Sequence, residues 1–573
     1  MQLQIHRSFY WRLVVIIGFF VLLFAAILVR VFSLAIVEHR QFALAAESQH
    51  ADSETLVSLR GTIYAQDKSG MLHPLAIQET LYTLIAVPKN ISDPEKTALA
   101  LSEILGIPLS ELMTRLGKAD DPYEVISRKL DLKRADAVRA LDLEGVSLEE
   151  ESRRSYPQGS LASAVVGFAS WQEDGENGEY GIEKEYQSYL KGERGFFEGD
   201  KDASGYWIAL GKRILDPPVH GESIVLTLDT NIQYKLEEKL NELMEKWKPE
   251  SAAGVIIEPS SGKVLALASR PTFDPNAYSQ EKDFSVFRNP IIDSQFELGS
   301  VFKPITMSGG IEERVVTATS TYEDTGAVKL NGYTIKNFDL LAHGIETMTQ
   351  VLEKSLNTGA IFVEQRLGRD RFLDTIERFG FGAKTGVDFP GEVSGDISAL
   401  RAKDTREVNF ATASFGQGIA VTPLQMAMAI SAIANHGVLM RPFLVEKIID
   451  ENGTEEVVHP QAVRQVISPE TAETISKMLV SVVKNGFDKR SGIEGYFLAG
   501  KTGTALIPAR GGYSDEVIHT IIGFAPAFDP KFFVLLQMNK PIGNRFAANT
   551  LSSPLHDLAE FMINYYEIPP DTN

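Results

Sequence analysis

The sequence predicts a protein of mixed α and β structure that is anchored in a membrane and built from more than one domain. An uncharged apolar stretch runs from Leu13 to Val29 near the N-terminus. Beyond it, amphipathic helical patterns and strand patterns rich in apolar, β-branched residues follow one another along the chain. The 573 residues, 44% of them hydrophobic, can bury the cores of several domains.

The apolar stretch is expected to form a single transmembrane helix in the cytoplasmic (inner) membrane. Its length is close to the roughly 20 residues that cross a bilayer. Arg7 and Arg12 precede it, which favours a cytoplasmic N-terminus and places everything after about residue 38 outside. A cleaved signal peptide, cut at residues 43–45, is the alternative. The apolar run is long for a signal peptide, and charged residues 38–40 intervene before that cut.

Two domains are expected after the span, with their boundary at the turn-rich segment Asp216–Gly221. The first has helical patterns at Pro94–Leu105 and Ala135–Leu143 but no constellation of catalytic residue types. The predicted division is 1–37 for a short tail and the span, 38–220 for a non-catalytic domain, and 221–573 for a catalytic domain.

The catalytic domain opens with a strand pattern at Ser223–Leu228 and an amphipathic helical pattern at Asn231–Met244. Further strand patterns, separated by segments that are helical in character, occur at residues 252–268, 520–526 and 532–538. The C-terminal residues 569–573 are expected to be disordered.

Ser300 and Lys303, in Gly-Ser-Val-Phe-Lys-Pro, are the candidate nucleophile and base. Side chains three residues apart lie on one face of a helix, so the two can meet if the segment is helical. Pro304 lacks an N–H and is tolerated only in the first turn of a helix, which predicts a helix start close to Ser300. The positive end of that helix would stabilise negative charge on an attacking oxygen.

A serine hydroxyl needs a base to become a nucleophile, and no histidine lies near these motifs. Lys303 can serve if its pKa is lowered by burial and by a second cation, for which Lys501 is the candidate. Ser355 and Asn357 lie two residues apart in Glu-Lys-Ser-Leu-Asn-Thr-Gly, so in a loop or turn both can project into one cleft. There they would relay a proton and hold a substrate amide.

Lys501 begins the motif Lys-Thr-Gly-Thr inside an apolar run that predicts a strand bordering the cleft. Gly503 would let a ligand approach the backbone closely, and Thr502 and Thr504 would hydrogen-bond a substrate carboxylate. The backbone amides of Thr504 and Ser300 would form an oxyanion hole.

Similar short motifs recur elsewhere, because a Ser-x-x-Lys spacing is only weakly specific. Three further pairs are expected to be ordinary surface pairs: Ser260 with Lys263, Ser279 with Lys282, and Ser481 with Lys484. A second Lys-Thr-Gly at residues 384–386 lies in a segment punctuated by Gly and Pro, which favours a structural loop. Order along the chain distinguishes Ser300 and Lys501 from these repeats.

The three ordered motifs resemble those of the penicillin-binding proteins and the serine β-lactamases. Text elsewhere in the chain is similar to the class B penicillin-binding proteins, which are monofunctional peptidoglycan transpeptidases; it includes Arg154–Phe168, Gly181–Tyr186, Ala253–Ala268 and Asn409–Gly418. The resemblance covers nearly the whole chain. One departure is Ala65, which stands where the N-terminal signature of the family usually has an aspartate.

The resemblance implies the penicilloyl-serine transferase fold, an antiparallel sheet flanked by helices with a cleft between the sheet edge and a helical lobe. It implies that Ser300 attacks the D-Ala-D-Ala end of a peptidoglycan stem peptide, and that β-lactams acylate the same serine. Residues 38–220 would form a pedestal of the penicillin-binding protein dimerisation type. The implied partners are a membrane lipid-linked glycan polymerase and division or elongation proteins, with division preferred.

Composition excludes other classes of function. A formal net charge of −20 argues against a nucleic-acid partner, which would require a basic face. Zero cysteines exclude disulfides and a thiolate nucleophile. No metal or other cofactor is expected.

Two alternatives stay open on the sequence alone. The same motifs serve hydrolases such as a D-Ala-D-Ala carboxypeptidase or a β-lactamase, although a secreted hydrolase needs neither a retained anchor nor a long pedestal. The non-enzyme alternative is a β-lactam sensor or assembly scaffold with a vestigial acylation site, which the intact motif residues disfavour.

Overall fold

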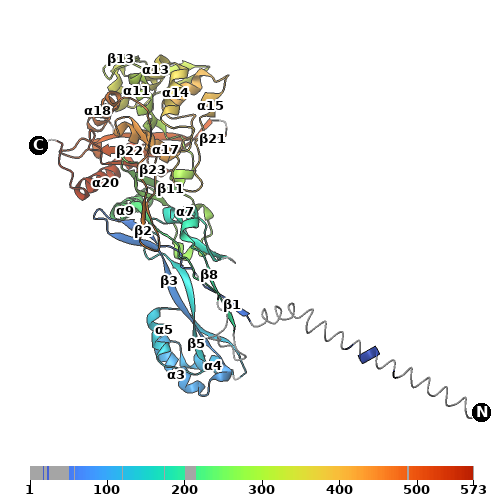
Figure 1. The fold of residues 1–573 in the computed structure, drawn as a ribbon. Coiled ribbons are helices and arrows are strands. Elements are labelled where there is room, and N and C mark those ends of the chain that lie inside the picture. The colour runs from blue at the N-terminus through green and yellow to red at the C-terminus, as the bar shows by residue number, and fades with distance from the viewer. Residues whose placement is uncertain are drawn as a thin grey trace, which may run out of the picture. The chain divides into compact units, whose positions relative to one another are not determined.

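A computed structural model describes residues 51–56, 58–118, 120–172, 175–200, 214–486, 489–510 and 512–571, together with positions 17, 22–24 and 27 (Figure 1). The chain forms two compact units, Met1–Ser58 with Gly192–His220 and Leu59–Lys191 with Gly221–Asn573. Over the described residues, no helix is both long and apolar enough to cross a membrane. Apart from isolated positions, the transmembrane segment predicted at Leu13–Val29 lies outside those residues.

The smaller unit contains a three-stranded antiparallel sheet in the order β1-β8-β9. Its strands are β1 (Ala51–Leu56), β8 (Gly195–Asp200) and β9 (Ile214–Asp216). The pairing of β1 with β8 runs from Ala51 opposite Asp200 to Leu56 opposite Gly195. The sheet therefore joins the two stretches of chain that make up this unit.

In the larger unit, strands from distant parts of the sequence share one seven-stranded sheet. Its order is β19-β18-β10-β2-β3-β4, and β5 pairs with β3 off this path. The strands are β2 (Ile63–Gln66), β3 (Leu72–Ala86), β4 (Glu124–Leu130), β5 (Val146–Ser155), β10 (Ser223–Asp229), β18 (Val445–Ile449) and β19 (Glu455–Val457). β10 pairs with β2 in parallel and with β18 antiparallel, which ties the N-terminal strands to the C-terminal half.

Three helices pack beside β3, β4 and β5 around a small core of their own. They are α3 (Pro94–Leu105), α4 (Leu109–Leu116) and α5 (Leu132–Arg139). The helix predicted at 94–105 is confirmed. The helix predicted at 135–143 is found at Leu132–Arg139, so it both begins and ends earlier than predicted. Its start is set by the Asp131 side chain, which caps it by accepting a hydrogen bond from Arg134 N.

The C-terminal half contains a five-stranded antiparallel sheet in the order β12-β11-β23-β22-β21. Its strands are β11 (Ser251–Ile257), β12 (Val264–Arg270), β21 (Ala499–Ala509), β22 (Gly512–Ala525) and β23 (Phe532–Asn539). The strands predicted at 252–268, 520–526 and 532–538 are confirmed, the first as a hairpin. β21, which carries Lys501, lies at the sheet edge, as predicted.

Both faces of this sheet are buried, because successive side chains of a strand point to opposite sides. Along β23, Phe532, Val534 and Leu536 enter one core, whereas Phe533 and Leu535 enter the other. The first core is completed by α9 (Thr230–Trp247) and α20 (Ser552–Tyr565). Helix α9 confirms the amphipathic helix predicted at 231–244.

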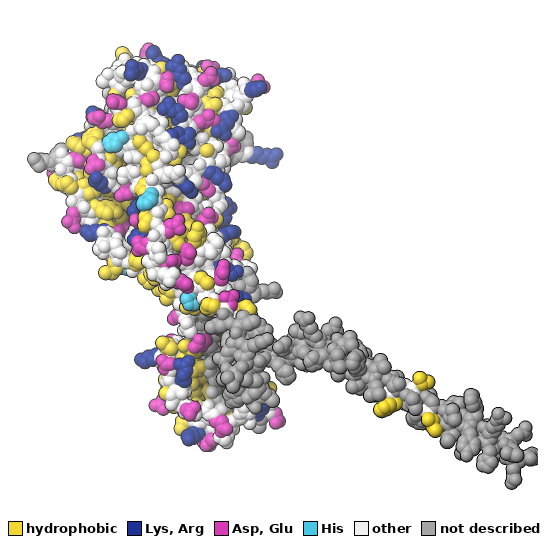
Figure 2. Space-filling model, in the orientation of Figure 1, with side chains coloured by type: hydrophobic (Ala, Val, Ile, Leu, Met, Phe, Trp, Pro, Cys, Tyr) yellow, Lys and Arg dark blue, Asp and Glu magenta, His cyan; other side chains and the backbone are white. Residues whose placement is uncertain are grey.

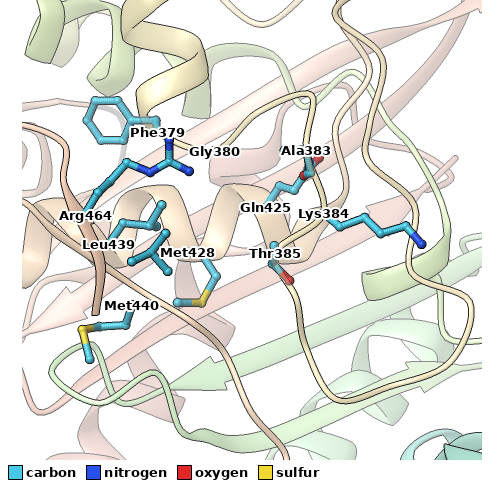
Figure 3. A pocket seen from close by; sticks show the side chains of 11 residues that line it. Phe379, Gly380, Ala383, Lys384, Thr385, Gln425, Met428, Leu439, Met440 and Arg464 are labelled. Atoms are coloured by element: carbon cyan, nitrogen blue, oxygen red, sulfur yellow. The ribbon is translucent and has the colours of Figure 1, made fainter. Parts of the chain in front are cut away.

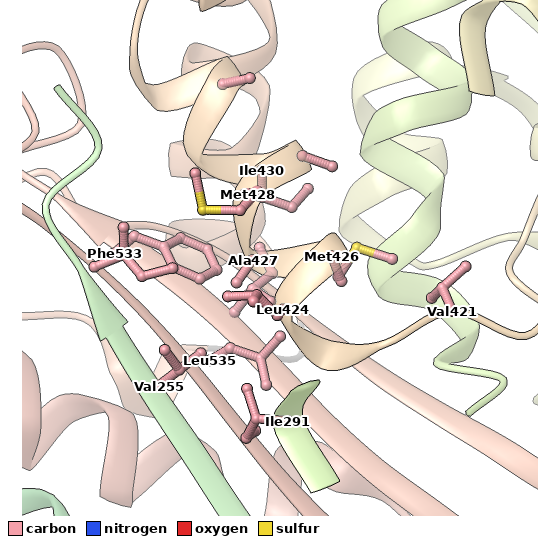
Figure 4. Close-up of a cluster of buried hydrophobic side chains, with 14 of the residues drawn as sticks. Val255, Ile291, Val421, Leu424, Met426, Ala427, Met428, Ile430, Phe533 and Leu535 are labelled. Atoms are coloured by element: carbon pink, nitrogen blue, oxygen red, sulfur yellow. The ribbon is translucent and has the colours of Figure 1, made fainter. Parts of the chain in front are cut away.

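The second core is built around α17 (Pro423–Ala434), in which every residue is buried (Figure 4). A helix that is apolar on all sides belongs inside a protein. Figure 4 shows its Leu424 and Met428 facing Phe533 and Leu535 of the sheet. The capping box of Thr422 with Gln425 fixes where this helix starts.

The remaining elements of the larger unit are mostly short. The helices are α6 (Ser163–Val166), α7 (Gly181–Glu185), α8 (Gln187–Leu190), α10 (Pro290–Asp293), α11 (Lys303–Glu312), α12 (Met348–Glu353), α13 (Asn357–Leu367), α14 (Arg369–Arg378), α15 (Ser398–Arg401), α16 (Glu407–Ala413), α18 (Pro469–Asn485) and α19 (Ala547–Thr550). The strands are β6 (Ala169–Gln172), β7 (Gly175–Gly178), β13 (Thr321–Asp324), β14 (Ala327–Leu330), β15 (Tyr333–Lys336), β16 (Gly344–Thr347), β17 (Val438–Met440) and β20 (Ala462–Gln465).

The C-terminal tail differs from the prediction of disorder over the part that is described. Asp571 donates its backbone N–H to Gly495 O at 2.9 Å, and its carboxylate accepts from Phe497 N at 2.7 Å.

Near the other end, Ala65 is buried in β2 with 2% of its surface exposed, where an unpaired carboxylate would be destabilising.

The formal charge of −20 is not gathered on one side of the surface that Figure 2 shows. Acidic and basic side chains are interspersed there, with hydrophobic side chains between them.

Candidate active site

Ser300 lies in a tight helical turn that leads into α11, as the position of Pro304 predicts. The 3-10 turn Gly299–Phe302 is followed directly by α11, which begins at Lys303. Gly299 has φ of 63° and donates its N–H to Gly416 O at 3.1 Å. Ser300 therefore sits at the positive end of a helical segment.

Lys303 is buried with 1% of its surface exposed. Its Nζ donates to Ser355 O at 2.5 Å and to Ser355 Oγ at 3.2 Å. Burial, followed by the positive charge of Lys501, holds the pKa of Lys303 well below its usual range. These are the two causes that the sequence predicted for lowering the pKa of this lysine.

Ser355 occupies the turn between α12 and α13 and is buried. Its φ of 55° lies in the left-handed region, which is uncommon for residues other than glycine. In this left-handed conformation, the carbonyl and the hydroxyl of Ser355 both accept hydrogen bonds from Lys303 Nζ. A glycine would adopt the conformation easily but would lack the hydroxyl.

Asn357 is the first residue of α13. Its side-chain Nδ2 donates to Lys336 O, at the end of β15, at 2.9 Å. Ser355 and Asn357 thus come from one turn, as predicted.

Lys501 lies on β21 with 2% of its surface exposed, and its Nζ donates to Thr502 O at 3.0 Å. The close approach at Gly503 is made by the chain itself. A Cβ added there would lie 2.5 Å from Leu298 O and 3.1 Å from Val301 N, so only glycine lets the turn Gly299–Phe302 pack on this strand.

Thr504 continues the contact between β21 and the turn Gly299–Phe302. A Cβ added at Gly299 would lie 3.0 Å from Thr504 O, which shows how closely the two backbones approach. The Thr504 hydroxyl accepts from Ala547 N at 3.1 Å, at the start of α19. The turn that contains Ser300 therefore lies directly against the strand segment that contains Thr504.

The structure places Lys303 beside Ser355 and within the influence of Lys501, and it packs the turn that contains Ser300 against Gly503 and Thr504. Among the described residues, Ser300 Oγ makes no hydrogen bond with Lys303, whose ammonium group is directed to Ser355. Hydrogen bonds between a nucleophile and its base often tighten only in the reacting complex.

The second Lys-Thr-Gly is a loop, as predicted. Thr385 N and Thr385 Oγ1 both donate to Glu392 Oε1 at 2.5 Å, and Gly386 N donates to Glu392 Oε2 at 3.1 Å. This loop borders a pocket of the C-terminal half in which Lys384 and Thr385 lie beside Gln425 and Met428 (Figure 3). None of the eight predicted site residues lines that pocket.

Two of the other Ser-x-x-Lys pairs make structural contacts. Lys263 forms an ion pair with Glu446 at 2.7 Å. Ser481 Oγ donates to Glu353 at 2.5 Å, and Lys484 lies over the ring of Phe497.

The sequence interpretation missed the polar residues beneath Asn357. Asp324, Asn337 and Thr358 are buried and hydrogen-bonded to one another. The position of Thr358 directly after Asn357 in the motif was a sequence signal that could have identified Thr358. Nothing in the sequence pairs Thr358 with Asp324 and Asn337, which are more than twenty positions away.

Two family descriptions match the chain. "Penicillin binding protein transpeptidase domain" matches residues 252–556, and "Penicillin-binding Protein dimerisation domain" matches residues 55–226. Stage V sporulation protein D of Bacillus subtilis is 34% identical over 496 residues, which cover 85% of this chain and 76% of that protein. Peptidoglycan D,D-transpeptidase FtsI of Escherichia coli is 30% identical over 561 residues, covering 96% of this chain and 91% of that protein.

Solved structures have the same fold. Penicillin binding protein 2X from Streptococcus thermophilus superposes with a TM-score of 0.79 at 23% identity, over 90% of this chain and 80% of that one. Penicillin binding protein 3 from Mycobacterium tuberculosis, complexed with aztreonam, gives 0.69 at 26% identity, over 90% and 98%. The predicted transpeptidase fold is confirmed, and the chain belongs to the class B penicillin-binding proteins.

Proposed function

We propose that this chain is a peptidoglycan D,D-transpeptidase that cross-links stem peptides through an acyl-enzyme on Ser300. It would act in the synthesis of cell wall during cell division. One observation carries the proposal. Lys303, three residues after Ser300 in a helical segment, is buried and has its pKa lowered by burial and by Lys501. A lysine in this state can accept the proton of a serine hydroxyl. The relative from E. coli is named a peptidoglycan D,D-transpeptidase, which supports the same reaction.

In the acylation step, Ser300 Oγ attacks the carbonyl carbon of the penultimate D-Ala while its proton passes to Lys303 Nζ. The backbone amides of Ser300 and Thr504 stabilise the resulting oxyanion. The peptide C–N bond then breaks, and the proton passes through the Ser355 hydroxyl to the departing amine of the terminal D-Ala.

In the transfer step, an amine of a neighbouring stem peptide attacks the ester carbon and gives up a proton to Lys303. The bond between that carbon and Ser300 Oγ breaks, the proton returns to Ser300, and the cross-link is complete. Asn357 would hold an amide of the donor peptide. Thr502, Gly503 and Thr504, with the charge of Lys501, would hold its terminal carboxylate.

A β-lactam contains an amide that can be attacked in the same way, but its leaving group stays attached after the ring opens. Ser300→Ala should therefore abolish covalent labelling by a fluorescent penicillin. Ser260→Ala is the matched control, since the exposed Ser260 has the same spacing from a lysine. It should label like the wild type, and undiminished labelling of Ser300→Ala would refute the assignment.

The lifetime of the adduct separates transfer from hydrolysis. A transpeptidase keeps the penicilloyl group because water is excluded from the ester, so release should be slow compared with labelling. Rapid release of the group by water would instead support a β-lactamase-like hydrolase.

We also propose a membrane location with the catalytic half outside the cytoplasm. The uncharged stretch Leu13–Val29 and the preceding Arg7 and Arg12 support this arrangement. Residues 38–220 would then act as the pedestal, and 221–573 as the transpeptidase domain. A lipid-linked glycan polymerase in the same membrane would be the natural partner, because cross-linking follows synthesis of the glycan strand.

A further inference from the structure

A buried carboxylate lies beneath the Ser355 and Asn357 motif. Asp324 ends β13, has 2% of its surface exposed and accepts four hydrogen bonds. Its Oδ1 accepts from Thr358 Oγ1 at 2.7 Å and from Gly326 N at 2.9 Å. Its Oδ2 accepts from Asn337 Nδ2 at 2.8 Å and from His343 N at 3.0 Å. Each oxygen of the Asp324 carboxylate therefore accepts two hydrogen bonds.

Two of these four donors, Thr358 and Asn337, come from the two segments that hold Asn357. Thr358 is the next residue in α13, and its backbone N–H donates to Asn337 Oδ1 at 3.3 Å. Asn337 follows Lys336, whose carbonyl accepts from Asn357 Nδ2 at 2.9 Å. Asp324 therefore binds the neighbours of both partners in the Asn357 contact.

Tyr322 closes the network from the other side. Its hydroxyl lies 3.1 Å from Thr358 Oγ1. A threonine hydroxyl has one proton to donate, and the contact with the carboxylate of Asp324 is the shorter of its possible acceptor contacts. Tyr322 is then the donor in its own bond, and every polar group of the network has a defined role.

The charged form of Asp324 matches this set of donors. Burial opposes ionisation, but the hydrogen bonds from Gly326, Thr358, His343 and Asn337 outweigh it and hold the pKa of Asp324 below its usual range. An ionised carboxylate only accepts hydrogen bonds, so all four donors are satisfied by it. A neutral amide in its place would direct an N–H group at two of them.

We propose that Asp324 is a positioning residue of the transpeptidase site, which holds Asn357 and Ser355 in place through Thr358 and Asn337. It touches neither the substrate nor the reacting atoms. Its effect is to fix the first turn of α13, so that the turn containing Ser355 presents its carbonyl and hydroxyl to Lys303. The inference rests on the proposed function, because its readout is acylation of Ser300.

The test is acylation kinetics of Asp324→Asn with a fluorescent penicillin. Losing hydrogen bonds to a buried charge should misplace Ser355 and Asn357 and reduce the acylation rate at saturating penicillin by about 10-fold to 100-fold. Thr358→Val removes one link and should also slow acylation. Thr358→Ser keeps the hydroxyl and should restore the rate.

Glu392→Gln is the matched control for loss of a buried carboxylate. Glu392 also accepts three hydrogen bonds, from Thr385 N, Thr385 Oγ1 and Gly386 N, in the second Lys-Thr-Gly loop. This variant should lower the thermal midpoint but leave the acylation rate unchanged, which separates positioning from general destabilisation.

Acylation of Asp324→Asn at the wild-type rate, or equal slowing by Glu392→Gln, would overturn the inference. If Asp324→Asn does not fold, equal rates for Thr358→Val and Thr358→Ser would overturn it. A wild-type chain that penicillin does not label would refute the proposed function and this inference together. A labelled wild type with unchanged variants would refute the inference alone.

Discussion

At the scale of single residues, the pKa of Lys303 decides when the proposed base can act. A protonated lysine cannot accept the proton of Ser300, so acylation should be lost as the pH falls through the Lys303 pKa. Burial lowers that pKa most, and the positive charge of Lys501 lowers it further. Both effects extend the working range of the enzyme towards neutral pH.

Replacing Lys501 by glutamine should move the acidic limb of the acylation profile to higher pH. The substitution removes the neighbouring cation, so the Lys303 pKa rises and more of the base is protonated at any given pH. The measurement is the rate of penicillin acylation across a pH series. Lys501→Arg keeps the charge and should leave the limb in place. A limb that does not move in Lys501→Gln would show that Lys501 does not tune Lys303.

The roles of these two lysines could be proposed from the sequence. Lys303 has helical spacing from Ser300, and Lys501 belongs to a motif that follows the others in the expected order. The left-handed conformation of Ser355 could not be predicted, because serine rarely adopts a positive φ. Nor could the sequence predict Asp324, whose partner Thr358 is 34 positions away and is reached only in the folded chain. Contacts of that kind leave no periodic pattern.

At the scale of elements, β22 places a buried histidine directly opposite the Lys-Thr-Gly-Thr strand. His519 pairs with Thr504 across the two strands and has 0% of its surface exposed. Its Nδ1 lies 2.9 Å from Thr550 Oγ1 in α19. Burial lowers the pKa of His519 to about 4 from its ordinary value of 6.5.

Acid should therefore destabilise this part of the fold before it protonates His519 in the native state. The unfolded chain binds the proton at about 6.5 and the folded chain only at about 4, so stability is full above 6.5 and is lost as the pH falls towards 4. The free energy of unfolding should fall by about 3 kcal/mol over this window through this residue. Urea unfolding at several pH values measures it. His519→Gln should flatten the dependence, and an unaltered slope would contradict the assignment.

The elements themselves were predictable where one signal dominated. β23 alternates between two cores, and α3 carries both a capping aspartate and a terminal glycine, so their bounds were close to the prediction. The hairpin of β14 and β15 was not predicted, because its short strands contain no fully buried residue and have no strong apolar pattern. Its Val328, Leu330 and Ile335 pack against Ala360 and Ile361 of α13, a contact that forms only in the folded chain.

At the scale of the whole molecule, the larger unit has a core shared by its N-terminal and catalytic parts. Phe168 stacks on Tyr278 with ring centroids 4.2 Å apart and meets the edge of Phe287 at 4.9 Å. Tyr156 and Asn276 exchange two hydrogen bonds across the same boundary, at 3.0 and 2.9 Å. Residues on both sides of the predicted domain boundary thus contribute to one buried cluster.

Removing the Phe168 ring should destabilise both parts at once. Phe168→Ala deletes a buried aromatic side chain, which lowers the free energy of unfolding by about 3–5 kcal/mol. Because the core is shared, the temperature at which penicillin labelling is lost and the temperature at which secondary structure melts should fall together. Leu101→Ala is the control, since Leu101 belongs to the separate core beside α3, α4 and α5. It should melt that region earlier while labelling persists to the wild-type temperature. Labelling that survives unchanged in Phe168→Ala would mean that the catalytic half is stable without its N-terminal neighbour.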